Sequence, residues 1–210
     1  MIDAYFIHLL ILIGIYLVLA LSLQLAMGFS GLLNLGHMAF FAIGAYASAL
    51  LALAGFPYWV CILAAGVFAA LAGALLSIPT NRLKGDYLAL ATLGFSFVVY
   101  AIALNWTDLT RGPLGIPGIP RPEFLGFVFS DNLAFLGLTF FVCIATYLVL
   151  KRLTTSPFGT LLQGIRDHER AAQVLGHNTS RAKTLALATS AFFAGISGSL
   201  YAHYITFIDP

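Results

Sequence analysis

The stretch over residues 6–27 reads FIHLLILIGIYLVLALSLQLAM, and it lies in a longer segment, 4–81, that contains no Asp, Glu, Lys or Arg. A helix needs about 20 predominantly apolar residues to cross the hydrocarbon core of a bilayer. The 78 residues of this segment are therefore enough for three crossings. We expect helices over 6–27, 38–54 and 58–79, with turns between them at the glycines and proline of 28–31 and 55–57.

Three further stretches lack charged residues, namely 87–107, 132–150 and 184–208. Each run is continuous, without the alternation over roughly ten residues that marks a barrel strand. The sequence thus predicts an all-α fold, a polytopic transmembrane helical bundle of about six spans. Only 9% of the residues are charged and 60% are hydrophobic, whereas a soluble domain carries about 25% charged residues. This composition excludes soluble enzymes and secreted disulfide scaffolds, and a net charge of +2 gives no reason to expect a nucleic-acid partner.

The distribution of basic residues predicts the orientation. The loop over 151–183 contains six Lys and Arg against two acids, so it is expected to be cytoplasmic. Alternation then places the 105–131 loop outside, the 82–86 loop inside and the N-terminus outside. A re-entrant 28–37 stretch would reverse that last assignment.

The 151–183 loop contains a predicted amphipathic helix. Ser156-Pro157 is typical of a helix start and Gly176 of a helix end. On a helical wheel one face carries Phe158, Leu161, Ile165, Ala172 and Leu175, and the opposite face carries Gln163, Arg166, Asp167, Arg170 and Gln173. Periodicity alone fits a helix on the membrane surface as well as a helix that docks into a cytoplasmic partner.

Two other segments are rich in helix-interrupting residues. The stretch 28–37 places three glycines, Ser30, Asn34 and His37 between apolar runs; it fits either a tight turn at the membrane surface or the broken helix with which transporters bind substrate. The stretch 110–122 contains four prolines and three glycines, among them Gly112, Pro113 and Gly115. It is either a stiff connector or an outer docking or gating surface.

Several chemical motifs are absent from the sequence. It has no phosphate-binding Gly-Lys-Ser/Thr loop, no metalloprotease or nucleophile-elbow motif, and no cysteine spacing suited to zinc. No carboxylate lies inside the predicted spans, so a proton or sodium relay is not expected. We therefore predict a protein that is not an enzyme and has no metal or cofactor of its own. Any uphill transport would be driven through the cytoplasmic loop.

Three blocks of sequence resemble the permease subunits of bacterial ATP-binding-cassette importers for branched-chain amino acids, the M-type permeases of the Liv system. The first is GFSGLLNLGHMAFFAIGAY over 28–46. The second is RLKGDYLALATLGF over 82–95, continued by GPLGI over 112–116. The third begins with SPFG at 156–159 and RDHE at 166–169, and ends with SAFFAG at 190–195.

The resemblance implies a single transmembrane permease domain over 1–210, in the bacterial inner membrane, with a coupling helix in the 151–183 loop. It implies a second permease subunit as heterodimer partner, two cytoplasmic subunits that bind ATP and magnesium, a periplasmic amino-acid-binding protein, and surrounding lipid. The residues expected to couple to the ATPase are Phe158, Gly159, Ile165, Arg166, Glu169, Ala171, Ala172 and Gly176. Those expected along the substrate pathway are Ser30, Asn34, Gly36, His37 and Gly94.

The chain departs from the family pattern in two ways. Importer permeases often carry Glu-Ala-Ala-x-x-x-Gly in the coupling loop; Ala171, Ala172 and Gly176 fit this spacing, but Arg170 occupies the glutamate position and Glu169 lies one residue early. Family members also continue for about another hundred residues, which predicts a C-terminally truncated member. The alternatives are a permease for urea, amides or other small polar solutes, and a channel or scaffold that needs no ATPase.

Overall fold

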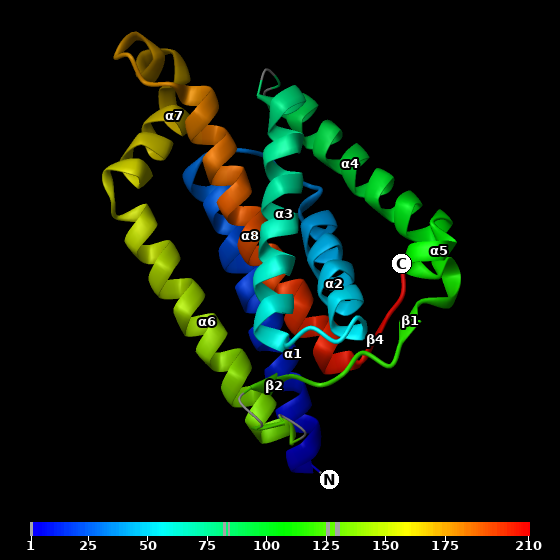
Figure 1. Cartoon of the computed structure of the whole chain (residues 1–210). Coiled ribbons are helices and arrows are strands. Elements are labelled where there is room, and N and C mark those ends of the chain that lie inside the picture. The colour runs from blue at the N-terminus through cyan, green and yellow to red at the C-terminus, as the bar shows by residue number, and fades with distance from the viewer. Residues whose placement is uncertain (1, 82, 84, 125–126, 129–130) are drawn as a thin grey trace.

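The computed structural model describes residues 2–81, 83, 85–124, 127–128 and 131–210 (Figure 1). Within these residues the long membrane helices are α1 Ile2–Gln24, α2 His37–Leu53, α3 Tyr58–Thr80, α4 Asp86–Asn105, α6 Asn132–Thr154 and α8 Thr179–Ile205. Five of them are long and apolar enough to cross a membrane, whereas α2 has 17 residues. The structure confirms the predicted all-α bundle of about six spans.

Helix α8 forms the centre of the bundle and packs against α1, α2 and α3 (Figure 1). Helix α6 lies against α1 on one side, and α4 contacts α2 on the other. In the most apolar 18 residues of each helix, the buried share is 67% for α8 and only 17% for α4. The core is therefore built around α8, and α4 is left at the edge.

Small residues allow this close packing. A Cβ on Gly44 of α2 would collide with the backbone of Gly195 on α8, and a Cβ on Gly195 would reach the carbonyl oxygen of Ala65 on α3. A Cβ on Gly198 would collide with the carbonyl oxygen of Phe41. Helix backbones can approach this closely only where side chains are absent or very small.

The helices alternate in direction along the bundle (Figure 1). The connection between α1 and α2, the turn after α3, and α7 Pro157–Val174 lie at one end, here called the α7 end. The start of α1, the α2–α3 turn and the connection from α4 to α6 lie at the other, the loop end. The start of α1 and the described part of the 105–131 loop thus lie at the loop end and α7 lies at the opposite end, which agrees with the predicted relative sides. The predicted inner charges Arg82 and Lys84 lie outside the described residues.

Five short elements order the described part of the connection from α4 to α6. A single turn, α5 Thr107–Thr110, is followed by a 3-10 turn, η2 Gly112–Leu114. Strand β1 Ile116–Pro117 then pairs antiparallel with β4 Phe207–Ile208, and β2 Glu123–Phe124 pairs with β3 Phe127–Val128. Gly112 and Gly115 both have positive φ, and a Cβ on Gly115 would collide with the Ile208 carbonyl oxygen. This connection is therefore folded onto the end of α8.

The helix ends differ from the predicted ends around the basic loop. Helix α6 continues to Thr154, beyond the predicted end at 150, because Lys151 and Arg152 in its last turn interact favourably with the helix dipole. Helix α8 begins at Thr179, ahead of the predicted start at 184, because the Asn178 side chain caps it by accepting the Arg181 N–H. It ends at Ile205 and not at 208, since Thr206 adopts a left-handed conformation before β4.

Candidate functional site

The end of α1 is interrupted where the sequence changes from apolar residues to glycine and serine. Leu25–Phe29 form a π-helical turn, η1. The Ser30 hydroxyl donates to the Ala26 carbonyl at 2.7 Å, and Gly31 adopts a φ of +66°, which takes the chain out of the helix. Residues 32–36 are irregular before α2 begins. The predicted interruption at 28–37 is therefore present, at the α7 end of the bundle (Figure 1).

A buried polar network joins this interruption to α1. The Ser22 hydroxyl donates to the Leu19 carbonyl at 2.6 Å and lies 2.7 Å from Nε2 of His37. Because the Ser22 hydroxyl proton is donated to Leu19, Nε2 of His37 is assigned as the donor to the Ser22 oxygen. Nδ1 of His37 then accepts from the Asn34 amide nitrogen at 3.3 Å. The Asn34 side-chain oxygen accepts the Gly36 N–H at 3.1 Å. A neutral His37 satisfies every one of these contacts.

Helix α4 also contacts the interruption, through Thr92. The hydroxyl of Thr92 accepts the Leu35 N–H at 3.0 Å, and a Cβ on Gly36 would collide with the Thr92 carbonyl oxygen. The structure thus brings together four of the predicted pathway residues, Ser30, Asn34, Gly36 and His37. It does not bring Gly94 to them, since Gly94 lies on an exposed part of α4 with no atom within 4 Å of a Cβ there.

Helix α7 contacts the same interruption through Arg166. Its Nη1 donates to the Gly28 carbonyl at 2.6 Å, and its Nε donates to Asp167 at 3.0 Å. Gly31 packs on the aliphatic part of Arg166, where a Cβ would be too close to the Arg166 Cγ. The Gly28 carbonyl lies in the π-helical turn, where regular helical hydrogen bonding ends. Arg166 therefore links the surface helix directly to the interrupted membrane helix.

A break divides α7 into two halves. The helix starts at Ser156-Pro157 and ends before Gly176, whose φ is +85°, as predicted. His168 has non-helical backbone angles, φ −146° and ψ 80°. The predicted apolar face is only partly buried: Ile165 and Ala172 are buried, whereas Leu175, which follows the last helical residue, is 77% exposed. Leu162, which the wheel did not place on this face, is fully buried.

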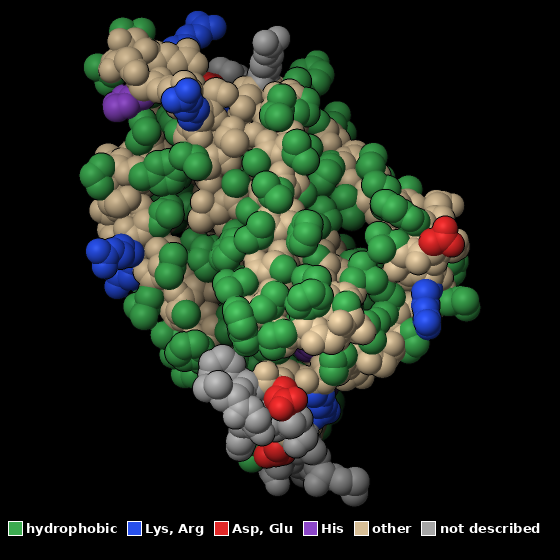
Figure 2. Space-filling model, viewed as in Figure 1, with side chains coloured by type: hydrophobic (Ala, Val, Ile, Leu, Met, Phe, Trp, Pro, Cys, Tyr) green, Lys and Arg blue, Asp and Glu red, His purple; other side chains and the backbone are tan. Residues whose placement is uncertain are grey.

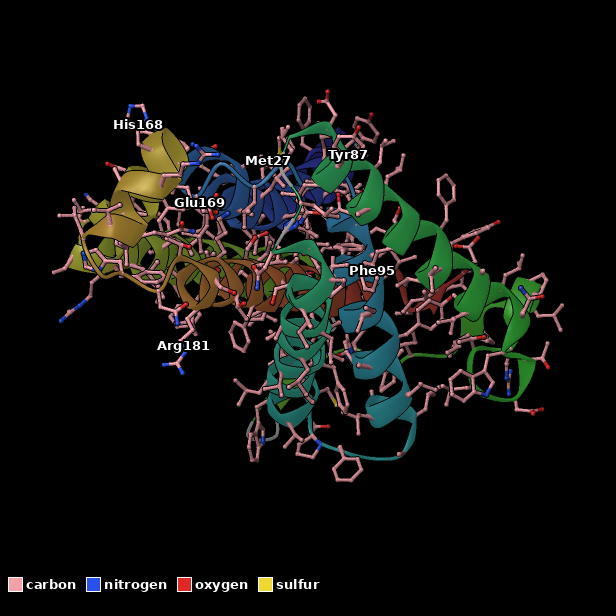
Figure 3. All side chains as sticks on the ribbon, turned by 90° about the horizontal axis from the view of Figure 1, so that it is seen from above. Met27, Tyr87, Phe95, His168, Glu169 and Arg181 are labelled. Atoms are coloured by element: carbon pink, nitrogen blue, oxygen red, sulfur yellow. The ribbon has the colours of Figure 1, made fainter. Side chains whose placement is uncertain are left out.

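An ion pair attaches the second half of α7 to α8. Lys183 Nζ lies 2.5 Å from the Glu169 carboxylate, and the two side chains are 8% and 15% exposed. Figure 3 shows Glu169 on the side of α7 that faces the bundle and His168 pointing away from it. Glu169, which stands one residue before the position expected from the family motif, is therefore directed to α8 and not to the outer surface of α7.

The other predicted coupling residues divide between two surfaces. Phe158 packs against the core, and Gly159, Ile165 and Ala172 are buried. Arg166, Ala171 and Gly176 are exposed. An open groove of about 800 Å³ follows α7; its lining includes Pro157, Leu161, Gly164, Ala171 and Leu175. The helix thus has one face held by the bundle and one apolar face open to a partner.

Sequence reasoning did not identify Ser22, Thr92 and Lys183. Each makes a contact over many residues of sequence, Ser22 with His37, Thr92 with Leu35 and Lys183 with Glu169. Two signals were present in the sequence: Ser22 lies within an apolar span and Lys183 lies at the start of one. Both indicate a polar contact, because buried polar groups in a membrane bundle need partners.

Replacing Lys183 with methionine is expected to lower the free energy of unfolding by about 3 kcal/mol, because the Glu169 carboxylate would lose its cation in a largely buried position. The double variant Lys183→Met/Glu169→Gln should recover most of this loss. The free energy of unfolding of the single and double variants would be measured on the purified protein in detergent. Arg152→Met, at an exposed position, is the control. Equal stability of Lys183→Met and Arg152→Met would contradict a stabilising ion pair.

Comparison with known proteins agrees with this architecture. Residues 5–210 match the family described as branched-chain amino acid transport system / permease component. The chain is 40% identical, over 93% of its length, to the high-affinity branched-chain amino acid transport system permease protein LivM of Escherichia coli (strain K12), and 39% identical to that of Salmonella typhimurium.

A more distant relative is the guanosine ABC transporter permease protein NupQ of Bacillus subtilis (strain 168), 26% identical over 84% of the chain and 60% of that protein. The chain spans 52% of the length of both enterobacterial LivM proteins. No solved structure matches it. The family match covers almost every residue, including the interruption at 28–37 and helix α7, and the chain therefore belongs to the permease family of branched-chain amino acid transport systems.

Proposed function

We propose that this protein is a permease subunit of an ATP-binding-cassette importer that moves branched-chain amino acids across the bacterial inner membrane. The observation that carries the proposal is the contact between Arg166 of α7 and the Gly28 carbonyl. Through this hydrogen bond, a surface helix in the basic connection contacts an interrupted membrane helix directly. The names of the LivM relatives support the branched-chain amino acid as substrate.

In this proposal the energy comes from other subunits, since the sequence has no ATP-binding motif of its own. Two cytoplasmic ATPase subunits would drive the permease pair, and the open face of α7, where Ala171, Gly176 and Arg166 are exposed, would sit in the cleft of one of them. Phe158, Gly159, Ile165 and Ala172 would hold the opposite face of α7 to the bundle. The ion pair between Glu169 and Lys183 would fix α7 to α8. A movement of α7 would then be transmitted to the membrane helices, because α7 could not simply bend at the break at His168.

The 28–37 segment would then move as a unit. Asn34 is bonded to Gly36 and His37, and Ser30 is bonded to Ala26 of η1. His37 lies within hydrogen-bond distance of Ser22 of α1, and Leu35 is bonded to Thr92 of α4. A pull on the Gly28 carbonyl would therefore shift the start of α2 together with α4. Such a shift would open the substrate pathway toward one side of the membrane and close it toward the other.

The remaining partners would cover the surfaces that this chain leaves open. A second permease subunit and lipid would cover the apolar faces of α4, including Gly94, and of α6. A periplasmic amino-acid-binding protein would bind at the loop end, where Gly112, Pro113 and Gly115 shape the ordered connection. The chain itself would carry out no covalent chemistry.

Uptake by the complete transporter tests the proposal. We expect proteoliposomes that contain the full-length permease, its partner permease and both ATPase subunits to accumulate labelled leucine only with internal ATP and an external binding protein. Unlabelled isoleucine and valine should compete, and guanosine should not. Leucine flux that is equal with and without ATP would indicate a passive channel and would contradict the proposal.

A nucleoside or another small polar solute is the second candidate substrate. The similarity to a protein named as a guanosine transporter permease favours it. In the same proteoliposomes, ATP-dependent uptake of guanosine without uptake of leucine would select this alternative. If unlabelled urea or acetamide lowered the uptake of the labelled solute and unlabelled valine did not, the small-amide alternative would be selected.

A further inference from the structure

Helices α2 and α4 meet near the α7 end and separate toward the loop end (Figure 1). Near the α7 end the Thr92 hydroxyl accepts the Leu35 N–H directly before α2, and the rings of Phe40 and Phe95 have centroids 5.6 Å apart. Farther toward the loop end, a groove of about 400 Å³ opens between the two helices. The groove therefore begins where α2 and α4 separate.

The walls of this groove are almost entirely apolar. Helix α2 contributes Ile43 and Leu50, α4 contributes Val99 and Trp106, and α3 contributes Phe68. The side chains of Phe68 and Trp106 are 52% and 55% exposed, so the groove is open on its outer side. Because it lies between membrane-spanning helices, this open side faces the hydrocarbon of the bilayer.

The length of the groove corresponds to one leaflet of the membrane. Its lining on α4 extends from Val99 to Trp106, a rise of about 10 Å at roughly 1.5 Å per residue. Half of the hydrocarbon core of a bilayer is about 15 Å thick. Trp106 caps α4 at the loop end, and tryptophan is enriched where the hydrocarbon meets the headgroups. The groove thus runs from the headgroup level at the loop end toward the middle of the membrane.

Two charged residues stand next to the loop-end mouth of the groove. They are Asp108 in α5 and Arg111, which directly follows α5, and both are exposed. No hydrogen bond or ion pair joins either side chain to another residue that the structure describes. Figure 2 shows an acidic and a basic side chain at this edge of the molecule, beside the hydrophobic side chains along α4. One anion and one cation are therefore available to a ligand at the headgroup level.

Thr110 holds the charged turn against the end of α4. Its buried hydroxyl lies 2.6 Å from the Ala103 carbonyl oxygen and 2.8 Å from that of Trp106, and it accepts the Gly112 N–H at 3.2 Å. Gly112 packs so closely that a Cβ there would collide with the Leu104 carbonyl oxygen. Thr110 also lines the groove. The positions of Asp108 and Arg111 are thus fixed relative to the groove by the packing of α4.

We infer that this groove binds one phospholipid with an ethanolamine headgroup from the leaflet at the loop end. One acyl chain would lie in the groove, Arg111 would bind the phosphate, and Asp108 would accept a hydrogen bond from the ammonium group. A guanidinium can donate two parallel hydrogen bonds to a phosphate. A choline nitrogen has no N–H to donate, and a headgroup without a cation would leave Asp108 facing a negative charge. The inference does not depend on the solute that the protein transports.

An acyl chain fits the groove better than a helix of a second subunit does. An α-helix with its side chains is about 10 Å or more across, whereas α2 and α4 are still in contact where the groove begins. An acyl chain is thinner and has no polar backbone. A helix of a second subunit would also give no reason for a cation and an anion without partners at the mouth.

A phosphatidylethanolamine with a photoreactive group on one acyl chain tests the inference. The full-length permease with its partner subunits would be irradiated in nanodiscs, and the cross-linked peptides identified by mass spectrometry. We expect cross-links on residues 43–51 of α2 and 99–106 of α4. Arg111→Gln should lower them about tenfold, as loss of a hydrogen bond from a charged donor does. Arg152→Gln, the same change at an exposed position of α6 at the α7 end, should leave them unchanged.

Competition between headgroups tests the role of Asp108. Unlabelled ethanolamine lipid should compete with the probe better than choline or glycerol lipids that carry the same acyl chains. Asp108→Asn should remove the preference for ethanolamine over choline without weakening the choline lipid. Equal competition by the three lipids in the wild type would overturn the assignment of an ethanolamine headgroup.

Filling the groove tests the position of the acyl chain. Ala47 lines the groove, so Ala47→Phe should abolish the cross-links at 43–51 and 99–106. Ala101→Phe places the same side chain at an exposed position of α4 outside the groove and should retain them. Cross-links spread evenly over the membrane helices, or unchanged in both Arg111→Gln and Ala47→Phe, would overturn the lipid site. A cross-link from Ala47→Cys to the partner permease would assign the groove to a subunit interface and would also overturn it.

Discussion

Replacing Arg166 with glutamate is expected to lower ATP-driven leucine uptake by roughly tenfold or more while the complex still assembles and hydrolyses ATP. Glutamate cannot donate to the Gly28 carbonyl, and it places a negative charge against that oxygen. A hydrogen bond from a charged donor contributes about 1.5–3 kcal/mol, which corresponds to at least a tenfold change in an equilibrium. Uptake and phosphate release would be measured on the same proteoliposomes.

Arg181→Glu is the matched control for this prediction. It makes the same charge change near the start of α8, and Figure 3 shows Arg181 pointing away from the bundle. Arg166→Lys should retain part of the uptake, because an ammonium can still donate to one carbonyl. If Arg166→Glu and Arg181→Glu lower uptake equally, net charge and not the Gly28 contact would explain the loss.

Replacing Gly198 with valine is expected to give the largest loss of stability, about 3 kcal/mol or more, as overpacking of a rigid contact does. A Cβ on Gly198 would collide with the Phe41 carbonyl oxygen, and also lie close to the Ala45 backbone nitrogen. Backbone atoms of two packed helices cannot move aside as a flexible side chain can. The measurement is thermal unfolding of the purified permease in detergent.

Gly137→Val on α6 serves as the control, because a Cβ there has no atom within 4 Å and the residue is exposed. Both variants place a β-branched residue in a membrane helix, so they share any change in helix propensity. We expect Gly137→Val to unfold within about 1 kcal/mol of wild type. Equal stability of the two variants would contradict the close α2–α8 contact.

The helix-forming segments and the α7 boundaries were predictable because they depend on local features. The absence of charge over 4–81 is read directly from the sequence, and so are the helix start signal at Ser156-Pro157 and the helix end signal at Gly176. The break at His168 was not predictable, because neither glycine nor proline marks it. The burial of Leu162, which lies outside the predicted apolar face, was likewise not predictable from a single helical wheel.

The candidate site was predictable as a stretch of sequence but not as a set of contacts. Ser30, Asn34, Gly36 and His37 are conspicuous in an apolar run, and they do lie together. Their partners Ser22 and Thr92, and the link from Arg166 to Gly28, join positions up to 138 residues apart. No local pattern specifies which polar groups will meet when helices pack.

Hydrophobicity and charge act on each segment independently of the others, so the sequence alone was enough to predict a helical membrane bundle with a basic, amphipathic connection at one end. The packing of the assembled bundle was needed to show that α8 is the central helix, that Lys183 pairs with Glu169 and that Arg166 reaches the Gly28 carbonyl. The physical reason is that packing depends on which small residues and polar groups of distant helices come into contact, and that choice is made by the assembled bundle as a whole.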